Sequence, residues 1–259
     1  MKTAPTKIPE ELMDGYTMNG TVKINHKYRD DIGGEKENGE IRELYTIDKF
    51  NEFTQRIEKK EWSYYGPTDG WLYQSLELFP IKNKNVLIIG STIPWYETIA
   101  LHYGAKKCTV VEYRKQKSFH PQIEYLTPDE IDNEGKQFDV CISISSVEHD
   151  GLGRYGDPLN PNADLEHMEN LKKLVVPGGV LYLAVPIGVD EVVFNLHRVY
   201  GRKRFHKLIK GWKTLIGEES PAFIKNDGFD NVSNGVNGSP YQPVFVLQNE
   251  DITFKSTVF

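Results

Sequence analysis

The stretch that decides the fold reads NVLIIGSTIPWYE and covers residues 85–97. Its apolar run ends at Gly90, a segment compatible with a helix follows, and the next β-branched run ends in an acid, Glu112. This layout holds an adenosine, because the glycine lets the backbone approach the ligand and the acid accepts both ribose hydroxyls. The acid follows the glycine by 22 residues, and about 20 are expected of one βαβ unit. The sequence therefore predicts a nucleoside-type cofactor, with an ordinary structural βαβ unit as the alternative.

The glycine turn indicates which cofactor to expect. A dinucleotide site needs G-x-G-x-x-G, so that N–H groups at the start of the helix can meet a pyrophosphate. This turn reads GSTIPW at residues 90–95, with one glycine and bulky residues where the later glycines would stand. S-adenosylmethionine has no phosphate, so we expect it rather than the nicotinamide cofactor of an oxidoreductase. The residues predicted to hold it are Gly90, Ser91, Thr92, Glu97, Glu112, Tyr113, Ser143 and Ser145.

Composition limits the remaining possibilities. The chain has 259 residues, 39% hydrophobic and 26% charged, which suits a globular protein with one large α/β domain and an appendage. A net charge of −6 gives no basic field for nucleic acid. No apolar run approaches the ~20 residues of a membrane span, and no secretory signal is evident. Cys108 and Cys141 lie in apolar runs, so we expect buried free thiols and a cytoplasmic protein of unknown oligomeric state.

Apolar runs and helical patterns alternate along the chain. Strands separated by helices predict a parallel sheet that is covered by helices on both faces. The expected strands cover residues 85–89, 108–112, 123–125, 138–144, 179–185, 212–217 and 244–248. The expected helices cover residues 47–60, 72–79, 94–103, 164–174 and 205–211.

A third informative block, FDVCISISSVEHD at residues 138–150, runs from a buried strand into a polar loop. In open α/β sheets ligands bind beyond the carboxyl ends of the strands. We predict His149 as a general base, because an imidazole titrates near pH 6.5, and Glu148 or Asp150 as the group that orients it. The alternative is that His149 only organises the loop. Asp157 is a second candidate base, or else a turn residue before a proline.

Candidate acceptor-binding residues follow in two segments. Arg198, in the run FNLHRVY at residues 194–200, offers a planar fork suited to carboxylate, phosphate or vicinal hydroxyls. Together with Arg154, Tyr155 and His197 it can form a pocket for an anionic acceptor. Either arginine can instead be a structural clamp on loop carbonyls. The acids and histidine at residues 164–169 lack a metal-binding spacing, so we expect a solvated helix face there and no metal.

Several of these strings resemble motifs of class I S-adenosylmethionine-dependent methyltransferases: VLIIG at 86–90, Glu112, FDVCISISS at 138–146 and LVVPGGVL at 174–181. Within that superfamily, GLGRYGDP at 151–158 and FNLHRVY at 194–200 are similar to a domain-of-unknown-function family found in nematodes and in bacterial polysaccharide gene clusters. The resemblance implies a Rossmann-like seven-stranded sheet whose last strand is antiparallel. The chain departs from the superfamily pattern where a second glycine is usual and Thr92 and Pro94 stand.

The resemblance implies an O-methyltransferase of a sugar, phosphosugar or nucleotide-sugar in surface polysaccharide biosynthesis. Oxygen is favoured over nitrogen because the chain lacks an Asp/Asn-Pro-Pro-Tyr-type string. The alternatives are a non-catalytic adenosyl-binding regulatory partner and a methyltransferase of a phosphate or carboxylate oxygen. We expect residues 1–80 to form an N-terminal extension, whose aromatic stretch at 62–71 is a candidate cofactor lid, and residues 81–259 to form the methyltransferase domain.

Overall fold

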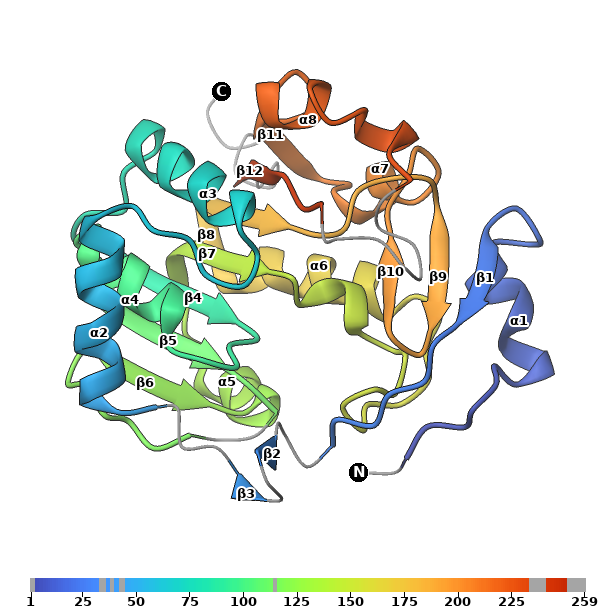
Figure 1. The fold of residues 1–259 in the computed structure, drawn as a ribbon, viewed down its shortest axis with the longest axis horizontal. Coiled ribbons are helices and arrows are strands. Elements are labelled where there is room, and N and C mark those ends of the chain that lie inside the picture. The colour runs from blue at the N-terminus through green and yellow to red at the C-terminus, as the bar shows by residue number, and fades with distance from the viewer. Residues whose placement is uncertain are drawn as a thin grey trace, which may run out of the picture.

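A computed structural model describes residues 3–32, 36–37, 40–41, 45–113, 116–232 and 241–250 of the chain. Its centre is a seven-stranded sheet with the order β11-β12-β8-β7-β4-β5-β6 (Figure 1). The five parallel strands are β4 (Asn85–Ile89), β5 (Lys107–Val111), β6 (Ile123–Leu126), β7 (Phe138–Ile144) and β8 (Val175–Ala184). The last strand, β12 (Val244–Asn249), is antiparallel to both β8 and β11 (Trp212–Ile216). The predicted seven-stranded sheet with an antiparallel last strand is confirmed.

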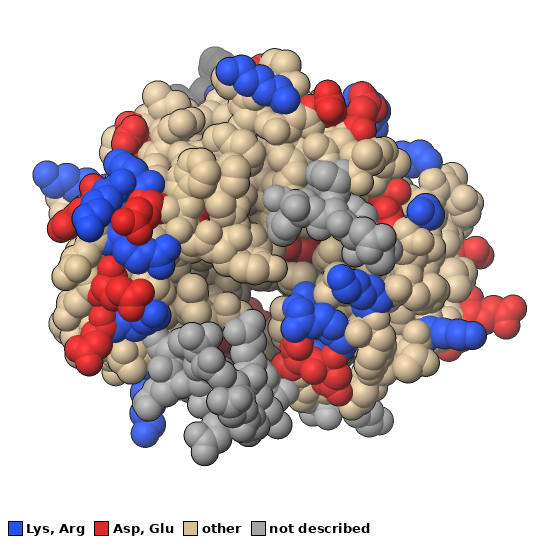
Figure 2. Space-filling view, in the orientation of Figure 1, with Lys and Arg blue, Asp and Glu red and all other residues tan. Residues whose placement is uncertain are grey.

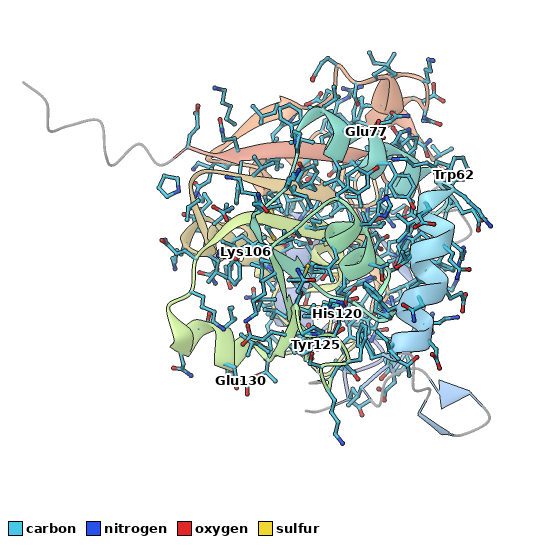
Figure 3. The ribbon with its side chains drawn as sticks, turned by 90° about the vertical axis from the view of Figure 1, so that its left-hand side faces the viewer. Trp62, Glu77, Lys106, His120, Tyr125 and Glu130 are labelled. Carbon is cyan, nitrogen blue, oxygen red and sulfur yellow. The ribbon has the colours of Figure 1, made fainter. Side chains whose placement is uncertain are left out.

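Helices cover both faces of this sheet, because side chains of each central strand alternate between two apolar cores. On β4, Val86 and Ile88 point into one core, and Leu87 and Ile89 point into the other. The first core is closed by α2 (Ile47–Glu58), α3 (Pro67–Leu78) and α4 (Trp95–His102). The second is closed by α5 (Pro128–Glu134), α6 (Ala163–Leu174) and α7 (Phe205–Leu208). Figure 3 shows α2 and α5, the latter marked by Glu130, on opposite sides of the sheet.

Most expected elements agree with the structure within a few residues. The bounds of β4 and β7 are as predicted, and α6 starts one residue early. The helix expected at residues 72–79 instead begins at Pro67, because the fixed φ of proline suits the first helical position. Cys108 and Cys141 are free and buried, as expected.

A smaller sheet that the sequence did not predict lies beside the main one (Figure 1). After α1 (Glu10–Thr17), β1 (Lys23–His26) pairs in parallel with β9 (Glu191–Phe194), which pairs antiparallel with β10 (His197–Val199). The N-terminal residues thus pair with a segment far along the chain, and the boundary proposed at residue 80 stays a prediction. The short remaining elements are β2 (Lys36–Glu37), β3 (Glu40–Ile41), α8 (Pro221–Ile224) and the 3-10 turns η1 (Val147–His149) and η2 (Gly228–Asp230). Within the described residues, no helix has the length and apolarity to cross a membrane.

Candidate active site

A cavity of about 390 Å³ opens at the carboxyl ends of β4, β5 and β7 and continues between α5 and α6. Figure 2, in the orientation of Figure 1, shows the molecule hollowed near its centre, where the arrows of these strands end. The carboxyl ends of parallel strands are where open α/β sheets bind ligands. The predicted site residues that line the cavity are Gly90, Thr92, Glu112, Tyr113, Ser145, His149, Asp150, Tyr155 and Asp157.

The turn after β4 is shaped for close approach of a ligand. Gly90 has φ +65°, and a Cβ added there would lie 2.4 Å from Ser146 Oγ, so a larger residue does not fit. The backbone N–H of Ser91 donates to Glu112 Oε2 at 3.2 Å, which ties the turn to the end of β5. The acid predicted to accept the ribose hydroxyls and the glycine turn predicted to approach the ligand are therefore brought together.

Ser91 and Glu97 are buried beneath this turn and do not line the cavity. The hydroxyl of Ser91 lies 2.9 Å from Glu97 Oε2, and both side chains are buried. Burial raises the pKa of Glu97 to about 7. Ser143 is likewise fully buried within β7, outside the cavity wall. These three predicted cofactor residues are placed next to the site rather than in it.

His149 presents a neutral imidazole to the cavity. Its Nδ1 lies 2.6 Å from the Leu196 carbonyl oxygen, and because a carbonyl only accepts, Nδ1 carries the proton and Nε2 has a free lone pair. Burial, followed by the charge of Arg154, holds the pKa of His149 well below its usual value. Nε2 lies 3.6 Å from Glu148 Oε1. This is the protonation state that a general base requires.

The cavity wall is acidic. Its carboxyl groups belong to Glu112, Asp132, Asp150, Asp157 and Glu166. None of the described residues that form this wall is a lysine or an arginine. Such a field favours a cationic ligand and opposes a pyrophosphate.

His167 was missed by the sequence analysis, which placed residues 164–169 on a solvated helix face. That expectation is wrong for Asp164, which has no exposed surface, and for His167, which lines the cavity. His167 Nδ1 lies 2.6 Å from Asp150 Oδ2, and the nearby carboxylate raises the pKa of His167 although burial opposes this. A signal was present in the sequence, because Asp164, His167 and Leu171 recur at helical spacing on one face.

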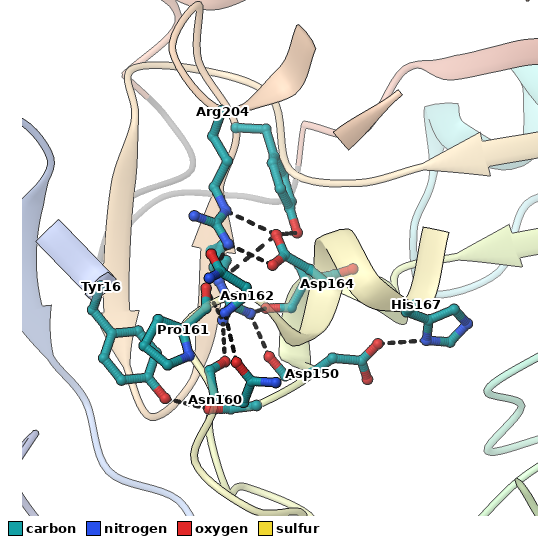
Figure 4. A network of polar contacts seen from close by, with 12 residues as sticks. Tyr16, Asp150, Asn160, Pro161, Asn162, Asp164, His167 and Arg204 are labelled. Carbon is teal, nitrogen blue, oxygen red and sulfur yellow. Dashed lines mark hydrogen bonds and ion pairs between the residues drawn. The ribbon is translucent and has the colours of Figure 1, made fainter. Parts of the chain in front are cut away.

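The predicted acceptor-binding arginines lie outside the cavity wall. Arg198 is 1% exposed, and its guanidinium donates to the carbonyl oxygens of Asp150 and Asn160. Asp164, the centre of the polar network in Figure 4, accepts from Arg204 Nε at 2.8 Å and lies 3.8 Å from Arg198 Nε. Arg198 therefore clamps the loop that carries Asp150.

Arg154 is also engaged elsewhere. Its Nε donates to Asp31 Oδ2 at 2.7 Å, and its guanidinium stacks over Tyr155 with 4.9 Å to the ring centroid. His197 lies on β10 and is not among the residues that line the cavity. Of the predicted acceptor residues, the structure places Tyr155 in the cavity. The wall of the cavity includes no residue of the aromatic stretch at 62–71, all of which is described.

The fold and the cavity define a Rossmann-like α/β protein with a ligand site at the carboxyl ends of its parallel strands. The chain belongs to the family described as "Caenorhabditis protein of unknown function, DUF268", whose model matches residues 83–224. No curated protein matches the sequence.

The similar solved structures include several methyltransferases. The N-methyltransferase NodS from Bradyrhizobium japonicum WM9, in complex with S-adenosyl-L-homocysteine, is 14% identical, with a TM-score of 0.46 over 77% of this chain and 99% of that one. An O-methyltransferase family protein from Burkholderia thailandensis is 10% identical, with a TM-score of 0.48 over 80% of this chain and 64% of that one.

Proposed function

We propose that this protein is an S-adenosylmethionine-dependent methyltransferase whose cofactor binds in the acidic cavity. The observation that carries the proposal is the position of Glu112 at the end of β5, hydrogen-bonded to the glycine turn and lining the cavity. A carboxylate there can accept both ribose hydroxyls, and the turn beside it leaves room for the methionine tail.

The charge and shape of the cavity support this cofactor over a dinucleotide. S-adenosylmethionine carries a sulfonium and an ammonium, whereas the pyrophosphate of NAD would face the acidic wall. Ile89, Val111, Ile131 and Leu171 line the part of the cavity near α5 and α6. Apolar side chains of this kind suit the flat face of an adenine.

Methyl transfer requires positioning above all. A lone pair of the acceptor attacks the methyl carbon, the carbon–sulfur bond breaks, and its electron pair stays on sulfur to give the neutral thioether. If the acceptor is a hydroxyl, its proton must leave, and His149 Nε2 is the proposed base, with Asp157 as the alternative. For the acceptor we propose a hydroxyl of a sugar-type molecule, as in surface polysaccharide biosynthesis, and the acidic wall argues against a phosphosugar.

Calorimetric titration of the protein with S-adenosyl-L-homocysteine tests the cofactor assignment. We expect Glu112→Ala to weaken binding about 100-fold or more, because the hydroxyls lose a charged acceptor and the turn loses its tie. Glu124→Ala is the matched control. Glu124 lies on β6, outside the cavity wall, and pairs with Lys107 and Lys136. Equal affinities of the wild type and Glu112→Ala would contradict the assignment.

A further inference from the structure

Three buried side-chain oxygen atoms have no hydrogen-bond partner among the described residues, and two of them belong to side chains that contact Ser145. These two atoms are Glu148 Oε2 and Gln242 Oε1. Glu148 is 1% exposed and Gln242 is 2% exposed. Buried acceptors are nearly always paired in folded proteins, and an unpaired one is costly, so each such atom calls for an explanation.

The two side chains share a neighbour, the hydroxyl of Ser145. Gln242 Nε2 donates to Ser145 Oγ at 3.0 Å, and Ser145 Oγ donates to Glu148 Oε1 at 2.6 Å. These bonds use the amide nitrogen of Gln242 and one carboxylate oxygen of Glu148, which leaves the amide oxygen of Gln242 and the second carboxylate oxygen of Glu148 without a partner. Ser145 itself has φ +53°, a strained conformation for a residue other than glycine. We call Ser145, Glu148 and Gln242 the Ser145 triad.

The triad lies beside the proposed cofactor site, at the carboxyl end of the strand next to β4. Ser145 lines the cavity just after β7, and Gln242 lies just before β12. In the sheet order, β4 with Gly90 stands between β7 and β5, which ends at Glu112. A cofactor with its ribose at β5 and its tail at β4 has its sulfonium between these two strand ends, and Ser145, at the end of the next strand, lines the same cavity.

We infer that the Ser145 triad binds the methyl acceptor beside the transferred methyl group, and that the acceptor presents a hydrogen-bond donor, a hydroxyl or an amine, rather than an anionic oxygen. This inference rests on the proposed function. Two unpartnered acceptor oxygens attract N–H and O–H groups and repel phosphate and carboxylate. Two nearby cations are already paired, Arg154 with Asp31 at 2.7 Å and Arg198 with Asp164 at 3.8 Å. Burial raises the pKa of Glu148 to about 7, although the hydrogen bond from Ser145 opposes this.

The test needs no knowledge of the acceptor, because sinefungin, an analogue of the cofactor, carries a primary amine where the transferred methyl would be. Calorimetry gives the dissociation constants of sinefungin and of S-adenosyl-L-homocysteine, which lacks that amine. We expect the dissociation constant of the wild type for sinefungin to be about 10- to 100-fold lower than that for S-adenosyl-L-homocysteine. This ratio is what hydrogen bonds to a charged partner typically contribute. Glu148→Gln and Gln242→Leu should each reduce this preference.

Variants and a control separate the outcomes. Loss of the preference in Glu148→Gln indicates that the amine is recognised by charge, whereas loss in Gln242→Leu alone indicates that it is recognised through a neutral hydrogen bond. Glu124→Gln removes a carboxyl that pairs with Lys107 and Lys136 outside the cavity wall, and it should leave the preference unchanged. Equal binding of both ligands by the wild type, or a preference unchanged in both triad variants, would overturn the inference. Failure of either ligand to bind the wild type would instead count against the proposed function.

Discussion

His149 and His167 line the same cavity, and their surroundings move their pKa values in opposite directions. Burial and the charge of Arg154 lower the pKa of His149, whose Nδ1 proton is held by a carbonyl. Asp150 raises the pKa of His167 against the effect of burial. The surroundings thus favour the neutral form of His149 and the charged form of His167.

The pKa of His167 predicts a pH-dependent contribution to stability. Because its folded pKa is raised, the contribution is full below the unfolded value of about 6.5 and is lost as the pH rises through the folded pKa. We expect His167→Gln to lower the free energy of unfolding more at pH 6 than at pH 9, as measured by urea denaturation. His206→Gln, which removes an exposed pair with Glu218, should show a smaller pH difference. A loss that is equal at the two pH values would show that Asp150 does not hold the charged form of His167.

At the scale of elements, Asp164 joins α6 to two segments that follow much later in the chain. Its carboxylate accepts from Arg204 just before α7 and from the Tyr200 hydroxyl at 3.0 Å, and it lies close to Arg198 of β10. These contacts keep the pKa of Asp164 below its usual value although the residue is fully buried. Through the clamp by Arg198, the same network fixes the loop that carries Asp150.

We expect Asp164→Asn to destabilise the protein by about 3–5 kcal/mol, because it leaves two buried arginine charges without their counter-charge. Urea denaturation monitored by circular dichroism measures the change. Asp230→Asn is the matched control: its pair with Arg202 is exposed, and such surface pairs contribute about 1 kcal/mol or less. A loss below about 1 kcal/mol for Asp164→Asn would mean that the network does not hold these elements together.

The sequence predicted what is encoded locally and missed what distant segments build. The bounds of β4 and β7 followed from continuous apolar runs, and Gly90 and Glu112 were found because one βαβ unit contains both. The strands β1 and β9 pair although they are far apart in the sequence. Each is too short to show an alternation of apolar and polar residues. Gln242 was missed for the same reason, since only the sheet order brings it to Ser145. Arg198 has the planar guanidinium expected of a ligand-binding residue, but the side chain is buried and donates to loop carbonyl oxygens instead.

At the scale of the whole molecule, the ligand site lies where the glycine turn, the end of β5 and the loop after β7 meet at one edge of the sheet. The acidic wall distinguishes this site from one built for a pyrophosphate, for which helix N–H groups and glycines are needed. Charge and backbone shape therefore point to the same cofactor.

The measurement that tests this claim most directly is a calorimetric comparison of S-adenosylmethionine, S-adenosyl-L-homocysteine and NAD on the wild-type protein. We predict that both adenosyl ligands bind with one-to-one stoichiometry and that NAD does not bind. Binding of NAD with no binding of either adenosyl ligand would contradict it and would leave only the fold and the family standing.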